Sequence, residues 1–433
     1  MCGGEGIGGK RVENFPAPGS RIPAPCRSGV ALRALVYRKS VPKYLLMRFG
    51  SKRVKSLETS RFSPLQIEEV SEPELPRPEW VRVKPLLSGV CGSDLGTLAS
   101  ESSPYFSPIT SPPFVMGHEI VGVVAEDNSG FSAGEKVVLE PALGCVVRGI
   151  NPPCEFCASG RHALCVNVAK GNISPGIQTG FCNSTGGGWS DGSLVAHPSQ
   201  LHRVPDELSD EAAVAVEPLA CAVHAALKAA PGSDETALVI GAGSVGLLTV
   251  AAVKNLAPPK RIICVAKHDR QRMEALRLGA DEVVHPREVY DRLPTMLGSD
   301  KYKPELGKPV VPGGAEVVFE CVGASGTMED ALRLTKPGGR VALVGMPGQK
   351  SSLDLTALWH KEVSLAGTYA YGMESYGGED VSSFELAMRL APEMNLASMV
   401  GPKFRLSDYA AAISAARSAG RAGNVKVVFD LRM

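Results

Sequence analysis

The most constraining feature of this sequence is a glycine turn between an apolar strand and a helix. In ETALVIGAGSVGLLTVAAVK, three glycines have G-x-G-x-x-G spacing. The first permits a tight turn, the second lets a pyrophosphate approach the backbone, and the third permits close contact of helix and sheet. Together with two residues at the helix N-terminus, they predict a dinucleotide site made of Gly241, Gly243, Ser244, Val245 and Gly246. A glycine turn in an α/β domain without a nucleotide is the alternative.

Strand and helix patterns alternate after this turn. Apolar runs such as RIICVA, DEVVH, EVVFECVG and RVALVGM alternate with helix-forming runs such as RQRMEALRLGA. This alternation predicts an α/β fold with a doubly wound parallel sheet, which we assign to residues 217–370. The Pro- and Lys-rich stretch 290–314 is expected to be a surface helix followed by a loop.

The end of the second strand bears on cofactor choice. An NAD enzyme places an acidic residue there to bind the ribose 2′-hydroxyl. This sequence has Ala266 instead, followed by Lys267, His268 and Arg270. These cations would suit a 2′-phosphate, so we expect NADP rather than NAD. The alternative is a solvated basic turn in which Asp269 binds the ribose.

The N-terminal half has a different pattern. Short apolar strands such as ALRALVY, LQIEEV, WVRVKPLLSGV and EKVVLEPAL are separated by Gly- and Pro-rich turns. They predict a barrel-like β-rich domain in residues 31–216. Residues 1–30 are rich in Gly, Pro and Arg and are expected to be a disordered extension or the product of an over-long start.

The composition limits which classes of partner and which cellular compartment are expected. The 46 basic and 45 acidic residues leave a net charge of +1, which favours neither nucleic acid nor a membrane surface. We find no apolar segment long enough to span a bilayer and no secretory signal, so a cytoplasmic protein is expected. In that reducing setting, clustered cysteines favour a metal over disulfides.

One such cluster lies in a lobe that we assign to residues 144–166 and that begins with the run GCVVRGINPPCEFCASGRHALC. The lobe contains Cys145, Cys154, Cys157 and Cys165. Four thiolates can close a tetrahedral structural zinc site, and a metal would compensate for the lobe's small apolar content. The alternative is a set of unliganded thiols in a surface loop. His162, inside the lobe, is expected to be exposed rather than a ligand.

Three further fragments carry candidate catalytic residues. GVCGSD contains Cys91, Ser93 and Asp94, GHE contains His118 and Glu119, and VEPLACAVH contains Glu217 and His224. A thiolate, an imidazole and a carboxylate can hold zinc with the fourth position open for water or substrate. Their order along the chain, ahead of the glycine turn, is hard to explain by chance.

These motifs resemble the medium-chain zinc-containing alcohol and polyol dehydrogenases from about residue 32 to the C-terminus. E-P-L stands where liver-type alcohol dehydrogenases have a cysteine ligand, so the sequence is most similar to the sorbitol, glucose and threonine dehydrogenase branch. The resemblance implies a GroES-like catalytic domain, made of residues 31–216 and 371–433, joined to a Rossmann domain. It also implies hydride transfer between NAD(P) and an alcohol, polyol or sugar, and a homodimer or homotetramer.

The resemblance further implies roles for the candidate residues. Cys91 and His118, with either Glu119 or Glu217, would hold catalytic zinc; Ser93 would accept the alcohol proton and Asp94 would orient a ligand.

The sequence departs from the pattern of this family at two places. Eight residues rather than two separate Cys145 from Cys154, with Asn151 where the first ligand would fall. Gly96 replaces a histidine that ends the proton relay in many relatives.

Two other readings remain open. A zinc-free quinone or enoyl reductase has the same fold, but the candidate zinc ligands and Ser93 argue against it. A non-catalytic cofactor-binding protein is also known for this fold, and the set of Cys91, Ser93 and His118 argues against that. Metal content and alcohol-dependent reduction of the nicotinamide would separate these readings.

Overall fold

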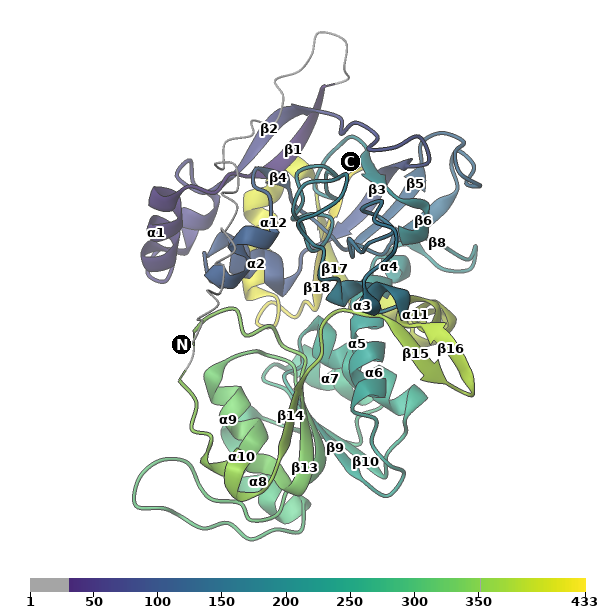
Figure 1. Ribbon diagram of the computed structural model, residues 1–433. Helices are drawn as coiled ribbons and strands as arrows, with labels where there is room; N and C mark the ends of the chain where they lie inside the picture. The colour runs from purple at the N-terminus through teal and green to yellow at the C-terminus, as the bar shows by residue number, and fades with distance from the viewer. Residues whose placement is uncertain (1–30, 351) are drawn as a thin grey trace, which may run out of the picture.

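The computed structural model describes residues 31–350 and 352–433, so the expected disordered extension lies outside the described residues. Figure 1 shows a β-rich upper half and a lower half in which helices cover a parallel sheet. This arrangement confirms the α/β class, with a β-rich part and a Rossmann-type parallel sheet. In the part of the chain that the model covers, no helix is long and apolar enough to cross a membrane.

The Rossmann-type sheet has six parallel strands in the order β11-β10-β9-β12-β13-β14. Its strands are β9 (Thr236–Ile240), β10 (Arg261–Val265), β11 (Glu282–Val284), β12 (Ala315–Glu320), β13 (Thr335–Leu343) and β14 (Ser364–Gly367). The central strands β9, β10 and β12 are largely apolar runs because helices cover both faces, whereas the edge strand β14 is exposed. The associated helices are α6 (Ser244–Leu256), α7 (Asp269–Arg277), α8 (Val289–Met296), α9 (Ser325–Leu334) and α10 (Thr356–His360). Helix α8 and the loop after it match the prediction for residues 290–314.

The β-rich half is built on a larger sheet with the order β17-β18-β3-β5-β6-β8, with β7 also paired to β3. Its strands are β3 (Val81–Gly89), β5 (Ile120–Val124), β6 (Lys136–Leu139), β7 (Leu194–Ala196), β8 (Leu201–Arg203), β17 (Val400–Phe404) and β18 (Lys426–Asp430). The last two strands come from the C-terminal end of the chain, and β18 lies antiparallel to β3 (Figure 1). A small sheet of β2 (Leu65–Ser71), β1 (Ala31–Tyr37) and β4 (Phe114–Val115) completes this half.

Helices connect and flank these sheets. Helix α5 (Val216–Lys228) packs against α6 and links the halves through a shared core that contains Leu219, Val223 and Leu247. The remaining elements are α2 (Gly92–Leu98), α3 (Glu155–Ala158), α4 (Asp210–Ala213), α11 (Ser383–Leu390), α12 (Tyr409–Ser418) and the hairpin β15 (Met373–Tyr376) with β16 (Glu379–Ser382). Single-turn 3₁₀ segments join several of these elements.

One stretch departs from the prediction. Between β1 and β2 the sequence predicted Pro-rich turns, but the structure has helix α1 (Val41–Gly50) followed by the 3₁₀ turn η1 (Lys55–Thr59). Ser40 caps α1 by accepting a hydrogen bond from the Lys43 amide, and Pro42 lies in the first turn, where no helical amide partner is needed. The prediction of Pro-rich turns missed this helix, because proline is also common in the first turn of a helix.

Candidate functional site

The first catalytic fragment lies where β3 leads into α2. Cys91 is the N-cap residue of α2, and its amide donates to Asp94 Oδ2 at 2.9 Å. This capping bond fixes the first turn of the helix and therefore the directions of Cys91 and Ser93. Asp94 is fully buried, and Ser93 Oγ is buried without a hydrogen-bond partner among the described residues.

The second fragment reaches the same point from the start of β5. His118 Nδ1 lies 3.4 Å from Asp94 Oδ1, so the other ring nitrogen, Nε2, is the one left for a metal. Burial alone would lower the pKa of His118, but the adjacent Asp94 carboxylate raises it well above its ordinary value. Asp94 therefore contacts both Cys91 and His118, as the orienting role requires.

Three of the predicted ligands converge. The ligand atoms of Cys91, His118 and Glu119 all lie within 4.8 Å of one another. A thiol, an imidazole and a carboxylate form the donor set of a catalytic zinc site that keeps one position open. Two residues along the chain from Cys91, Ser93 Oγ is buried without a hydrogen-bond partner in the described chain, which fits a polar group arriving from outside.

A fourth charged residue completes this group, and sequence reasoning missed it. Lys426, at the start of β18, forms a buried ion pair with Glu119. Burial by itself would lower the pKa of Lys426. The negative charges of Glu119 and Cys91 outweigh burial, so the pKa of Lys426 is raised overall. Gly89 makes room for this pair, because a Cβ there would lie 1.9 Å from Glu119 Oε2. The available signal was a lone lysine beginning the apolar strand KVVFD.

The other candidate carboxylate lies close by but outside the ligand group. Glu217 is buried in the first turn of α5, and its Oε1 is 3.8 Å from the sulfur of Cys221. Burial raises the pKa of Glu217 to about 7, with the nearby charge of Glu119 adding to the effect. His224, further along α5, does not join the site, because its Nδ1 lies 2.7 Å from Glu374 Oε1.

The glycine turn has the geometry that a dinucleotide site needs. Gly241 has φ +99°, and a Cβ on Gly246 would lie 1.9 Å from Gly241 O. A Cβ on Gly243 would meet nothing within 4 Å, so the backbone there is open to a ligand. Ser244 Oγ donates to Val425 O at 3.1 Å, and Lys426 follows directly. The start of β18 therefore connects the glycine turn to the buried group of Cys91, His118 and Glu119. Val245 lies in the first turn of α6.

The basic turn after β10 is less free than the sequence suggests. Lys267 is exposed and has no carboxylate partner among the described residues. Arg270 pairs with Glu274 at 2.9 Å and also donates to Ser398 O at 3.0 Å. The ring of His268, the N-cap residue of α7, lies against Gly420. Only part of the predicted positive charge is thus available to a cofactor.

The four cysteines of the lobe lie close together. Ligand atoms of Cys145, Cys154, Cys157 and Cys165 lie within 4.8 Å of one another, and the sulfurs of Cys145 and Cys165 are 3.6 Å apart. The expanded loop therefore brings Cys145 to the group, while Asn151 is exposed. Burial by itself would raise the pKa of Cys154. Hydrogen bonds from the amides of Cys157 and Val166 lower that pKa to about 6, which favours a thiolate.

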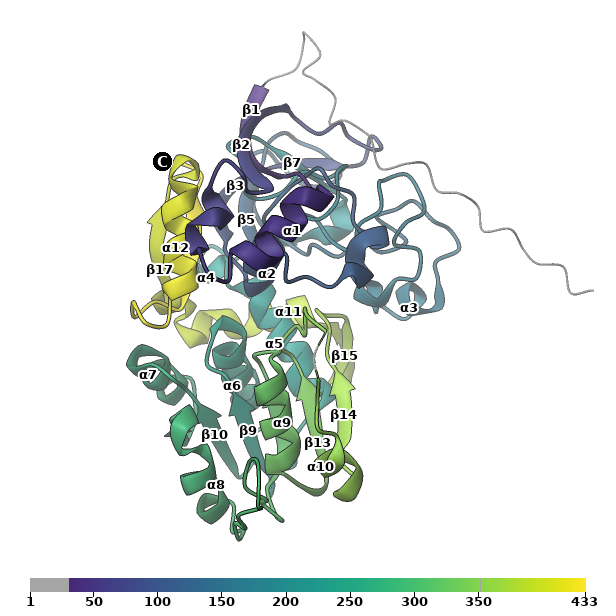
Figure 2. The same ribbon diagram turned by 90° about the vertical axis from the view of Figure 1, so that its left-hand side faces the viewer.

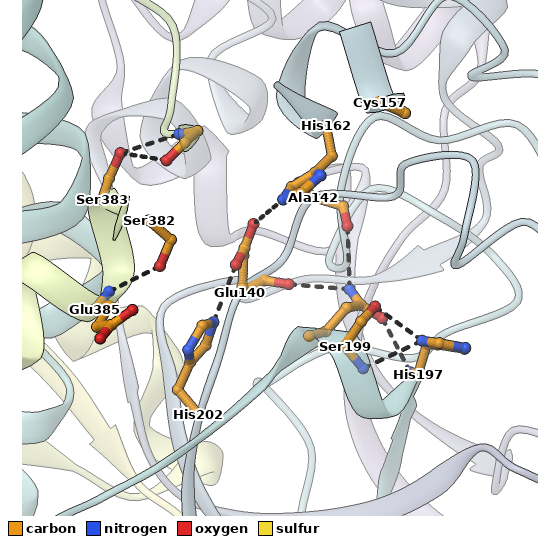
Figure 3. A network of polar contacts seen from close by, with 12 residues as sticks. Glu140, Ala142, Cys157, His162, His197, Ser199, His202, Ser382, Ser383 and Glu385 are labelled. Carbon is orange, nitrogen blue, oxygen red and sulfur yellow. Dashed lines mark hydrogen bonds and ion pairs between the residues drawn. The ribbon is translucent and has the colours of Figure 1, made fainter. Parts of the chain in front are cut away.

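Two buried polar groups hold the lobe in place. The guanidinium of Arg148 is fully buried and donates to backbone carbonyls, among them Leu143 O at 3.0 Å and Lys170 O at 2.9 Å. Glu140 lies between two histidines: His202 on β8, 3.0 Å away, and His162 of the lobe, 3.6 Å away (Figure 3). His162 is partly exposed and is not among the metal ligands, as predicted.

Comparisons with known proteins agree with this geometry. Residues 77–206 match the alcohol dehydrogenase GroES-like domain, and residues 244–388 match the zinc-binding dehydrogenase domain. The chain is 32% identical to sorbitol dehydrogenase of Arabidopsis thaliana over 298 residues, covering 68% of this chain and 74% of that protein. It is 31% identical to L-idonate 5-dehydrogenase of Vitis vinifera over 299 residues, with the same coverage.

A solved structure shows the same fold. The 2R,3R-butanediol dehydrogenase of Bacillus subtilis superposes with a TM-score of 0.65 at 23% identity, covering 92% of this chain and 99% of that one. Fold and site together define a zinc-type oxidoreductase of two domains. The chain belongs to the medium-chain zinc-containing alcohol and polyol dehydrogenase family, and it is an enzyme. The sequence-based family assignment is confirmed.

Proposed function

We propose that this enzyme oxidises a secondary alcohol of a polyol or sugar, or reduces the matching ketone, with zinc and NADP. The observation that carries the proposal is the convergence of Cys91, His118 and Glu119 beside the unpartnered Ser93 hydroxyl. The names of the relatives add the substrate class, since they act on sorbitol and L-idonate. When bound, zinc would polarise the substrate oxygen and the nicotinamide would accept the hydride.

We assign the third metal ligand to Glu119. Its ligand atom lies in the same group as those of Cys91 and His118, whereas Glu217 lies outside that group. The Glu119 carboxylate also forms a buried ion pair with Lys426, and a metal binds a carboxylate in its ionised form. Glu217, with its raised pKa, can exist as a neutral acid near neutral pH and can hydrogen-bond to water or substrate beside the metal.

The proton leaves through the chain's own residues. Ser93 lies two residues after Cys91, and its Oγ can accept the substrate proton because no described group engages it. Asp94 fixes Cys91 and His118 but does not contact the substrate in this scheme. Gly96 stands where many relatives have a histidine, so water and the ribose of a bound cofactor would have to take the proton from Ser93.

The turn after β10 is the part of the chain that would distinguish NADP from NAD. Ala266 at the end of β10 is buried and offers no acceptor to a ribose hydroxyl. Lys267 provides the free cation for a 2′-phosphate, with His268 beside it, while the charge of Arg270 is shared with Glu274. We therefore assign NADP, with Lys267 as its main charge partner.

The remaining assignments rest on the resemblance and the fold. We propose domain limits of 31–216 with 371–433 for the catalytic domain and 217–370 for the nucleotide domain. Structural zinc held by Cys145, Cys154, Cys157 and Cys165 accompanies the catalytic ion, in a cytoplasmic homodimer or homotetramer.

Replacement of the proton acceptor tests the mechanism. Ser93→Ala should bind NADP and zinc as the wild type does but slow polyol oxidation by about 10²–10⁴-fold, the usual contribution of a positioned acid–base group. Ser93→Thr retains a hydroxyl and is the matched control, expected to keep more activity than the alanine variant. Single-turnover reduction of NADP by sorbitol or xylitol measures the step. An unchanged rate in Ser93→Ala would remove its assigned role.

A further inference from the structure

Helix α1 and the turn after it form a basic and apolar surface, which we call the α1 surface and define as residues 38–62. The segment contains eight Lys or Arg residues and one acidic residue, Glu58, so its net charge is +7 in a chain with a net charge of +1. It precedes the part of the chain that matches the GroES-like family domain, which begins at residue 77. The catalytic machinery uses none of it.

Large apolar side chains of this surface are exposed to solvent. Six of the 24 exposed large apolar residues in the described chain lie here, with exposed fractions from 40% to 73%: Val41, Leu45, Leu46, Phe49, Val54 and Phe62. Val41 and Phe49 are exposed to 73% and 72%. Single exposed apolar residues are normal, but six within one short helix and the turn after it are a concentration that indicates an interaction site.

The inner face of the same segment is firmly held. Met47 is fully buried, Arg48 donates to Ser100 O at 3.1 Å, and the buried Glu58 pairs with Arg417 of α12 at 2.8 Å. These contacts fix the helix, so the outer face is presented without further folding. In Figure 1 α1 lies at the outer left edge of the upper half, and in Figure 2 it faces the viewer.

Several cations of the α1 surface have no counter-charge. Lys52, Arg53 and Arg61 are exposed and form no ion pair with any described carboxylate, whereas Arg38 is paired with Glu68. A partner with negative charge would therefore gain attraction without breaking existing pairs.

We propose that the α1 surface docks the enzyme on a bilayer that contains anionic phospholipid. Charge complementarity selects negative headgroups, and the exposed Val41 and Phe49 insert between them. A projecting helix would need a matching groove on a protein partner, whereas a bilayer interface accepts apolar side chains without one. The combination of basic cluster and apolar anchors supplies the two signals that stable peripheral binding needs.

Vesicle sedimentation tests the proposal with the purified full chain. It should sediment with phosphatidylcholine vesicles that contain about 30 mol % phosphatidylserine and stay in solution with pure phosphatidylcholine. Binding should fall as salt is raised, because the attraction is between exposed charges. The double variant Val41→Ser, Phe49→Ser and the triple variant Lys52→Glu, Arg53→Glu, Arg61→Glu should each lose about tenfold or more in partitioning.

Matched controls separate this surface from general stickiness. Lys260→Glu, Arg287→Glu, Lys303→Glu makes the same change in net charge at exposed positions of the nucleotide half, and Leu306→Ser removes a side chain that is 91% exposed. Both should bind vesicles as the wild type does. All variants should keep wild-type kcat/KM and thermal stability, since the catalytic residues are untouched.

Three results would overturn the proposal. The wild type could fail to bind phosphatidylserine vesicles at low salt, or the charge control could lose as much binding as the α1 variant. Alternatively, Val41→Ser, Phe49→Ser could change the sedimentation coefficient of the protein alone, in which case the surface is a contact between copies of this chain.

Discussion

At the scale of single residues, the site depends on how the negative charge of Glu119 is balanced by a buried cation. Its carboxylate is buried against Lys426, in a space that exists because residue 89 is glycine. Sequence reasoning identified Cys91, His118 and Asp94 from short motifs, each of which depends on neighbours in the chain. Lys426 lies about three hundred residues away from Glu119 and follows no motif, so only the pairing of β18 with β3 reveals it.

Two isosteric variants separate the candidate third ligands. Glu119→Gln should lose catalytic zinc and leave Lys426 as an unpaired buried cation, with a stability cost of about 3–5 kcal/mol. Glu217→Gln should retain zinc, because its carboxyl already has a raised pKa and lies outside the ligand group. Zinc content and thermal unfolding measure both effects. Zinc loss in Glu217→Gln with full retention in Glu119→Gln would reverse the assignment.

Cofactor preference is decided at the turn after β10. Lys267 should favour NADP about tenfold through one exposed, charge-assisted contact, with a smaller contribution from Arg270 because Glu274 shares its charge. Ala266→Asp should reverse the preference, since a carboxylate repels the 2′-phosphate and accepts ribose hydroxyls. Lys267→Ala is the companion variant and should reduce the preference without reversing it. The ratio of kcat/KM for the two cofactors measures this, and a clear NAD preference in the wild type would contradict the assignment.

At the scale of elements, the structure brings the four cysteines of the lobe together and places the glycine turn between β9 and α6. Strand β1 and the β9–α6 turn were predictable because their patterns are local: apolar alternation, a glycine fingerprint and a helix. Helix α1 was not, because Pro42 suggests a turn until the capping Ser40 is recognised. The lobe also relies on Arg148, whose buried guanidinium lacks a carboxylate partner in the described chain and is held by carbonyl groups.

Removal of one lobe thiol should affect stability before chemistry. Cys157→Ser removes one of four ligands, so the structural zinc should be lost and the lobe loosened. Thermal stability should fall, and activity should follow only through unfolding or altered assembly. Cys182→Ser is the matched control, because Cys182 is buried nearby but is not in the ligand group. Unchanged zinc content and melting temperature in Cys157→Ser would refute the structural site.

At the scale of the whole molecule, the order of elements was predictable and the distribution of charge was not. Alternating strands and helices defined the nucleotide-binding half, and short strands defined the β-rich half. The return of β17 and β18 to the first half was expected from family resemblance alone, since no local pattern encodes it. The near-zero net charge gave no sign of the +7 segment at residues 38–62, because acidic residues elsewhere cancel it in the sum.

We propose above all that a metal held by Cys91, His118 and a carboxylate enables alcohol oxidation. The most direct test measures zinc per chain together with polyol-dependent reduction of NADP in the wild type and in Cys91→Ala. We expect about two zinc ions per chain in the wild type and about one in the variant, which should stay folded and lose activity. Full turnover in Cys91→Ala, or an active wild-type enzyme with no bound metal, would contradict it.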